Sequence, residues 1–299
     1  MKVLATRRFP GPALDELRDL EIVPLTRLEI ERPDVQALIV ANEPVPFELL
    51  PSLRLVADFS VGYDRIDVEA CRERSIAVVN TPGVLDAATA ELALALMLAT
   101  RRRLVEGDRL IRSGAWTRPW ADGFLGAELA GATLGIVGLG RIGSAVARRA
   151  RAFDARIVFT GRGSRASELG EYRTLDALLQ EADVVSIHVP LSQDTEGLIG
   201  ARELALLREG ACLVNTSRGE IVDEPALVQE LVDGRISAGL DVYAHEPRVP
   251  QELLGLDNVV LAPHIGSATG RTRAAMTRVV VDNILAFERG EPLLTLVSG

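Results

Sequence analysis

Short apolar runs, separated by proline, glycine and acidic segments, open the chain. They cover residues 3–5, 37–41, 53–57 and 76–79. Continuous apolar runs of this length are typical of parallel strands that are buried on both faces, with helices between them. The pattern therefore predicts alternating strands and helices in the N-terminal part.

The same alternation returns in the second half of the chain, where helical patterns separate further apolar runs. These runs cover residues 156–160, 184–189, 211–215, 236–241 and 259–262. Strands that alternate with helices in this way predict a doubly wound parallel sheet.

Two long helices are predicted outside these alternating segments. Residues 86–113 contain no proline and are apolar without a break at 92–99, which favours a helix buried on most sides, between domains or in a subunit interface. A last helix at 268–289 could return to the first domain. We therefore expect two domains, the second inserted into the first, with residues 1–90 and 271–299 in one and 91–270 in the other.

A glycine-rich turn begins the second half. Residues 133–150 read TLGIVGLGRIGSAVARRA, an apolar run, a GxGxxG pattern and then a helix. Such a turn brings the backbone close to a pyrophosphate, whose charge meets unpaired N–H groups at the helix N-terminus. The motif predicts a dinucleotide site at Gly138, Gly140, Arg141, Ile142 and Gly143.

Composition argues against several classes of partner. The 299-residue chain has a formal net charge of −9 and no basic block, so no nucleic-acid partner is expected. Cys71 and Cys212 are far apart and form no CxxC motif, so neither disulfides nor a metal site are predicted. Because the chain lacks a signal-like start and a long apolar span, we expect a cytoplasmic protein without membrane contact.

Three chemically capable side chains follow predicted strands, at the edge where open α/β sheets bind ligands. Arg218 could grip a carboxylate through two parallel N–H bonds. Glu246 could hold a histidine ring in one orientation and favour its protonated form, and His264 is the candidate acid. The other two histidines are His188, at a strand end, and His245, in a polar turn where a solvated ring is expected.

Six long motifs follow one another in the order known from one enzyme family. They are FSVGYDRID (59–67), NTPGVLDAATAELALALMLATRR (80–102), GATLGIVGLGRIG (131–143), NTSRGEIVDEPAL (215–227), AGLDVYAHEP (238–247) and APHIGSAT (262–269). On these motifs the chain resembles the D-isomer-specific 2-hydroxyacid dehydrogenases. Within that family it is similar to the glyoxylate and hydroxypyruvate reductases, and to the hydroxyphenylpyruvate reductases of plants.

The resemblance implies an α/β fold of two doubly wound parallel-sheet domains, with a Rossmann cofactor domain inserted into a flavodoxin-like substrate domain. It makes Arg218, Glu246 and His264 the catalytic group. It also implies further contacts, to the substrate from Val61, Gly62 and Ser267, and to the cofactor from Pro190, Thr216, Asp241 and Gly266.

The implied reaction is hydride transfer from a reduced nicotinamide to the carbonyl carbon of a small 2-oxo acid, while His264 donates a proton. The resemblance also implies a homodimer, through the helix at 86–113 and the loop at 116–126. Phe59, Tyr63 and Trp120 are candidates for the substrate pocket. A nicotinamide-sensing regulator on the same fold remains an alternative.

The segment after the run 156–160 bears on cofactor choice. In an NAD site, an acidic residue about twenty positions beyond the glycines binds the ribose hydroxyl. Here the chain reads TGRGSR, with no carboxylate before Glu168. Arg162, Ser164 and Arg165 would suit a 2′-phosphate, which favours NADP(H), although NAD(H) remains possible.

Other dehydrogenase classes fit less well. Lys2 is the only lysine of the chain, whereas short-chain, β-hydroxyacid and amino-acid dehydrogenases need a catalytic lysine. Zinc alcohol dehydrogenases need a Cys and His ligand set that is absent. Formate dehydrogenases resemble this chain, but carry Gln where it has Glu246.

Overall fold

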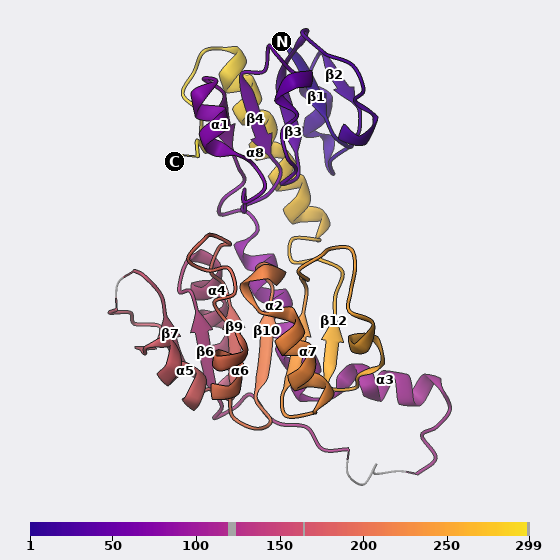
Figure 1. Ribbon diagram of the computed structural model, residues 1–299, viewed down its shortest axis with the longest axis vertical. Coiled ribbons are helices and arrows are strands. Elements are labelled where there is room, and N and C mark those ends of the chain that lie inside the picture. Colours follow the sequence, from indigo (N-terminus) through magenta and orange to yellow (C-terminus); the bar gives the residue numbers. More distant parts are fainter. Residues whose placement is uncertain (119–123, 164, 298–299) are drawn as a thin grey trace. The chain divides into compact units, whose positions relative to one another are not determined.

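The computed structural model describes residues 1–118, 124–163 and 165–297 (Figure 1). The chain divides into two compact units: unit 1 is Met1–Leu85 with Ser267–Gly299, and unit 2 is Asp86–Gly266. The boundaries expected from the sequence lie four to five residues further along the chain. Trp120 and Ser164, two of the predicted ligand-binding residues, lie outside the described residues.

Unit 1 is built on a parallel sheet of five strands in the order β2-β1-β3-β4-β5. This is the flavodoxin-like order, as predicted. Its strands are β1 (Lys2–Ala5), β2 (Leu20–Ile22), β3 (Val35–Val40), β4 (Leu55–Asp58) and β5 (Ala77–Val79).

Two α-helices accompany this sheet, α1 (Val68–Glu73) and α8 (Gly270–Glu288). The Thr269 hydroxyl caps α8 by accepting the Thr272 N–H at 3.1 Å, which satisfies one of the unpaired donors at the helix start. Helix α8 packs on β4 and on the 3₁₀ helix Pro12–Glu16. The end of the chain therefore belongs to the same unit as its beginning.

Unit 2 contains a parallel sheet of seven strands in the order β12-β11-β10-β9-β6-β7-β8. This is the strand order of dinucleotide-binding sheets with one further strand. Strands β7 and β8 follow β6 on one side and β9 to β12 lie on its other side, so the strand order reverses between β6 and β9. The predicted fold class is confirmed. The strands are β6 (Thr133–Val137), β7 (Arg156–Thr160), β8 (Glu171–Tyr172), β9 (Val184–Ile187), β10 (Cys212–Asn215), β11 (Ser237–Leu240) and β12 (Val259–Leu261).

Helices cover both faces of this sheet, each over its own hydrophobic core. Helices α2 (Asp86–Arg101) and α4 (Arg141–Ala150) share one core with the sheet. Helices α5 (Leu175–Glu181), α6 (Ala201–Leu206) and α7 (Glu224–Val232) share the other. Successive residues of β6 alternate between the two cores, which is why its apolar run is continuous.

The predicted helix at 86–113 is in fact two helices. Helix α2 ends at Arg101 and α3 (Leu104–Arg112) begins after Arg103, which adopts a left-handed conformation with φ 51°. One side of the apolar run of α2 is buried against the sheet of its own chain, where Ala93 and Met97 are fully buried. Ala95 of the same run is exposed, and its part in a subunit interface stays a prediction.

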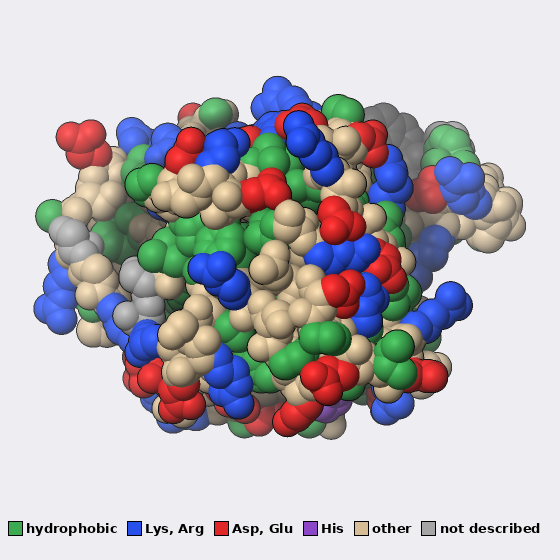
Figure 2. All heavy atoms as spheres, turned by 90° about the horizontal axis from the view of Figure 1, so that it is seen from above, with side chains coloured by type: hydrophobic (Ala, Val, Ile, Leu, Met, Phe, Trp, Pro, Cys, Tyr) green, Lys and Arg blue, Asp and Glu red, His purple; other side chains and the backbone are tan. Residues whose placement is uncertain are grey.

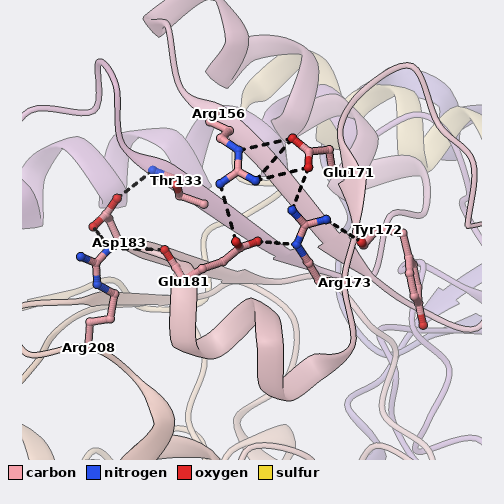
Figure 3. A network of polar contacts seen from close by, with 8 residues as sticks. All are labelled: Thr133, Arg156, Glu171, Tyr172, Arg173, Glu181, Asp183 and Arg208. Carbon is pink, nitrogen blue, oxygen red and sulfur yellow. Dashed lines mark hydrogen bonds and ion pairs between the residues drawn. The ribbon is translucent and has the colours of Figure 1, made fainter.

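An ion-pair network connects β7, β8 and α5 near the amino ends of the unit 2 strands (Figure 3). Arg156, which begins β7, contacts Glu171 of β8 at 3.3 Å and Glu181, which ends α5, at 3.6 Å. Arg173 joins the same two carboxylates at 2.7 and 2.8 Å. Nearby, the Asp183 carboxylate accepts the Thr133 N–H at 2.8 Å. These groups fix the amino ends of the strands, opposite the edge that carries the glycine turn.

Charged side chains of both signs are intermixed on the face shown in Figure 2. In unit 1, Arg32 contacts both Glu21 and Asp34, at 2.7 and 2.9 Å. Within the described residues, no helix is both long enough and apolar enough to cross a membrane.

Candidate active site

The glycine turn lies at the carboxyl end of β6, where the strand order of unit 2 reverses. Gly138 has φ 98°, a conformation that side chains disfavour. A Cβ at Gly138 would also lie 2.8 Å from Val189 and 2.9 Å from the His188 carbonyl carbon. Only glycine therefore allows the turn to pack against the segment that follows β9.

The other two glycines of the motif have different surroundings. A Cβ at Gly143 would lie 2.1 Å from the Gly138 oxygen, so this glycine lets α4 pack tightly on the turn. A Cβ at Gly140 would meet no atom within 4 Å. Because the first turn of α4 also contains no acidic residue, Gly140, Arg141 and Ile142 leave an open helix N-terminus that fits an anionic pyrophosphate.

His264 and Glu246 form a direct pair in unit 2. The His264 Nδ1 atom lies 2.7 Å from Glu246 Oε2, and 48% of the His264 side chain is exposed. Burial raises the pKa of Glu246, but the contact with His264, the Tyr243 N–H and the charge of Arg218 outweigh it, so the pKa is lowered. With Nδ1 donating to a carboxylate, Nε2 is the nitrogen left to face a ligand.

A buried carboxylate holds the loop that presents His264. Asp241 is fully buried, and its two oxygens accept the N–H groups of Ile265 and Gly266 at 2.7 and 2.8 Å. Burial raises the pKa of Asp241, against the effect of these two hydrogen bonds. The Asp241 carbonyl also accepts the His264 N–H at 2.9 Å, in a backbone with φ 52° at His264. Sequence reasoning missed this clamp.

The loop that carries Arg218 is also fixed from within. The buried Asn215 side chain donates to the Arg218 carbonyl at 2.7 Å and accepts the Ser217 N–H at 3.0 Å. A Cβ at Gly219 would lie 2.0 Å from the carbonyl carbon of Tyr243. Gly219 therefore lets the loop after β10 press against the loop that leads to Glu246.

The predicted catalytic residues thus come from three neighbouring strands of one sheet. Arg218 follows β10, Glu246 follows β11 and His264 follows β12. A cavity of about 290 Å³ borders the histidine and glutamate. Most of its lining is apolar, including Pro247, Val249, Leu254 and Leu261.

The remaining histidines are poor candidates for the acid. His188 Nε2 lies 2.8 Å from the Ser186 hydroxyl, and burial lowers the pKa of His188 to about 4. It is therefore neutral near pH 7. His245 is exposed, as predicted.

Two buried polar atoms just after the neighbouring strands β9 and β10 lack a hydrogen-bond partner among the described residues. They are Nδ1 of His188 and the hydroxyl of Thr216. Thr216 is one of the residues predicted to contact the cofactor, and Pro190 follows His188 on the same loop. An unpaired hydroxyl at this position suits a polar ligand, because burial without a partner is costly.

The two arginines expected at a 2′-phosphate have partners of their own. Arg162 Nη1 lies 2.8 Å from Asp194 Oδ2, and the guanidinium of Arg165 lies 4.9 Å from the centre of the Tyr172 ring. The sequence shows no carboxylate in the segment after β7, but the fold brings Asp194 there from the loop after β9. The local sequence does not reveal this carboxylate, and the preference for NADP(H) stays a prediction.

The remaining predicted substrate residues belong to unit 1. Asn80 donates to the Val61 carbonyl at 2.9 Å and thereby holds the backbone that leads to Gly62. Ser267 begins the second segment of the unit. Phe59 is buried, with its ring 4.5 Å from that of Phe9, and a role for it in the substrate pocket stays a prediction.

Residues 94–266, more than half of the chain, match the family model described as "D-isomer specific 2-hydroxyacid dehydrogenase, NAD binding domain". A glyoxylate reductase of Pyrococcus furiosus is 46% identical to the chain, covering 99% of it and 95% of the relative.

Two solved structures show the same fold over the full length. The TT0316 protein of Thermus thermophilus has a TM-score of 0.93 and 42% identity, with 100% of both chains covered. An NADPH-dependent glyoxylate/hydroxypyruvate reductase of Sinorhizobium meliloti, solved with NADP and malonate, has a TM-score of 0.90 and 36% identity, covering 99% of this chain and 96% of that one.

Proposed function

The chain belongs to the D-isomer-specific 2-hydroxyacid dehydrogenase family, and from this premise we propose that it reduces small 2-oxo acids to D-2-hydroxy acids with NADPH. The observation that carries the proposal is the pair His264–Glu246, 2.7 Å apart, on the sheet edge that also carries Arg218 and the glycine turn. The glyoxylate and hydroxypyruvate reductases among its relatives support substrates of that size.

In the proposed reaction, a bound reduced nicotinamide supplies the hydride. His264 donates a proton from Nε2 to the carbonyl oxygen of the substrate, while Glu246 keeps the ring oriented and favours its charged form. Arg218 orients the substrate and stabilises the negative charge that develops on that oxygen. We also predict that the substrate carboxylate binds to the N–H groups of Val61 and Gly62 and to Ser267.

The residues proposed to hold the cofactor belong to unit 2. Gly140, Arg141 and Ile142 would meet the pyrophosphate at the start of α4. Pro190 and Thr216 would line the nicotinamide half, and Arg162 and Arg165 would meet a 2′-phosphate. Asp241 and Gly266 would contact the carboxamide end while they support His264.

A panel of 2-oxo acids tests this function. We expect the chain to oxidise NADPH in the presence of glyoxylate and of hydroxypyruvate. The loss of NADPH absorbance measures the rate of each reaction. Faster turnover of hydroxyphenylpyruvate than of either would identify the plant-type activity instead. NADPH binding without turnover on any acid would identify a nicotinamide-sensing regulator and reject the proposal.

Replacing Arg162 by alanine is expected to raise the KM for NADPH far more than the KM for NADH. A charge-assisted contact with phosphate is worth about 1.5 to 3 kcal/mol, or roughly ten- to a hundredfold in affinity. Steady-state kinetics with both cofactors measure the change. The control is Arg208→Ala, because Arg208 pairs with Asp183 near the amino ends of the strands. Equal use of both cofactors by the wild type would rule out the NADPH preference.

Replacing Glu246 by glutamine is expected to move the basic limb of the reduction profile to lower pH. The lowered pKa of Glu246 keeps this carboxylate charged near neutrality, and a neutral amide in its place cannot stabilise a positively charged general acid beside it. The control is Glu224→Gln, a carboxylate that accepts the Ala244 N–H at 3.0 Å. An unchanged pH profile would leave Glu246 a structural role only.

We propose that the protein is a homodimer and that α3 contributes to its interface. This helix exposes apolar side chains, with Leu104 65% and Ile111 61% exposed, and exposed apolar groups of this size favour association. Light scattering at micromolar concentration should give twice the mass of one chain. A single species with the mass of one chain would reject the proposal. Residues 119–123 of the predicted interface loop lie outside the described residues.

A further inference from the structure

One ion pair joins the loops on either side of the glycine turn. Arg162 follows β7 and Asp194 follows β9, and these two strands flank β6 in the sheet. A Cβ at Gly161 would lie 3.9 Å from the Gly138 Cα atom, while Gly138 itself packs against His188 and Val189. The pair therefore links the two loops that flank the proposed dinucleotide site.

The loop that carries Asp194 is held in place by its neighbour. Thr195 is buried, and its hydroxyl donates to the Pro190 carbonyl at 2.6 Å and accepts the Ser192 N–H at 2.8 Å. The Thr195 N–H also donates to the Ser192 carbonyl at 3.0 Å. The carboxylate of Asp194 is thus attached to a fixed turn, and its position near Arg162 does not depend on a long flexible loop.

The ion pair itself is weak enough to be exchanged. The Arg162 side chain is 75% exposed and that of Asp194 is 72% exposed, so solvent and salt screen their attraction. A phosphate dianion makes stronger charge-assisted hydrogen bonds with a guanidinium than a solvated carboxylate does. A 2′-phosphate can therefore displace Asp194 from Arg162. The negative charge of the Asp194 carboxylate then stays close to the phosphate and repels it.

We propose that Asp194 sets the cofactor selectivity of this protein by competing with the 2′-phosphate for Arg162. The inference rests on the proposed function, because it assumes that the adenosine end of the cofactor lies at this loop. In this arrangement Asp194 weakens the binding of 2′-phosphorylated ligands and leaves ligands without that phosphate unaffected. Arg162 favours NADPH, and Asp194 limits how far that preference goes.

Calorimetry with two half-cofactor ligands tests the proposal without any turnover. Replacing Asp194 by asparagine, which keeps the size of the side chain, should tighten the binding of 2′,5′-ADP roughly two- to fivefold. Binding of 5′-AMP should not change. The gain should shrink at high salt, because both partners are exposed, and it should disappear when Arg162 is also replaced by alanine.

The matched control is Asp257→Asn. Asp257 also pairs with an arginine, Arg109, at 3.0 Å and is 65% exposed, but it precedes β12 at the opposite edge of the sheet. An equal gain in this control would make the effect one of net charge and overturn the proposal.

Two other outcomes would also overturn the proposal. Unchanged or weaker binding of 2′,5′-ADP by Asp194→Asn would do so, since Asp194 would then be neutral or would help Arg162 bind the phosphate. If the wild type bound neither nucleotide, the dinucleotide site itself would be wrong, and the proposed function would fail together with this inference. If the wild type binds 2′,5′-ADP and Asp194→Asn binds it equally well, this inference is rejected and the proposed function is not.

Discussion

Replacing His264 by alanine is expected to slow the reduction of oxo acids by roughly a hundredfold or more at saturating substrate, because a positioned general acid contributes about that factor. The affinity for NADPH should stay close to that of the wild type, since the glycine turn lies on another strand of the sheet. Stopped-flow kinetics for the reaction and fluorescence titration for NADPH binding measure the two effects separately.

His245→Ala is the matched control for this variant, since it removes an exposed histidine one residue before Glu246. Wild-type turnover is expected there. If His264→Ala also kept its turnover, the assignment of the acid would be wrong. Equal losses in both variants would mean that the loop, and not the proton donor, had been damaged.

Replacing Arg218 by lysine is expected to lower the catalytic efficiency toward oxo acids roughly ten- to a hundredfold, although the charge is kept. Lysine cannot make the two parallel N–H bonds with which a guanidinium grips a carboxylate. Such charge-assisted bonds are worth about 1.5 to 3 kcal/mol. The loss should appear in steady-state kinetics with every oxo acid, because all of them share the carboxylate.

The control for the lysine variant is Arg208→Lys, at an exposed ion pair with Asp183. It should leave the catalytic efficiency unchanged. If the Arg218 variant lost thermal stability as well as activity, a role in holding its loop would explain the result. A normal melting temperature with wild-type efficiency would remove Arg218 from the substrate site.

The buried strands were predictable because their apolar runs are continuous. The prediction for β7 matches its observed bounds, Arg156–Thr160, and β9 to β12 lie within their predicted runs. The short edge strands β2 and β8 were missed, since only one to two of their residues are apolar. The break between α2 and α3 was missed because the sequence at Arg103 contains neither glycine nor proline to mark it.

The candidate site was predictable as a set of residues but not as a geometry. The strand-end positions of Arg218 and His264 follow from the apolar pattern. The clamp from Asp241 to the N–H groups after His264 depends on the pairing of β11 with β12, which no local pattern reveals. The contact of Asp194 with Arg162 joins residues 32 positions apart, so it could not be inferred from the segment after β7 alone.

The product formed from hydroxypyruvate tests most directly whether this chain reduces 2-oxo acids to D-2-hydroxy acids. The purified protein should convert hydroxypyruvate to glycerate with one NADPH oxidised per molecule formed, and chiral chromatography should identify the product as D-glycerate. Formation of L-glycerate, or no NADPH-dependent loss of hydroxypyruvate, would contradict the account.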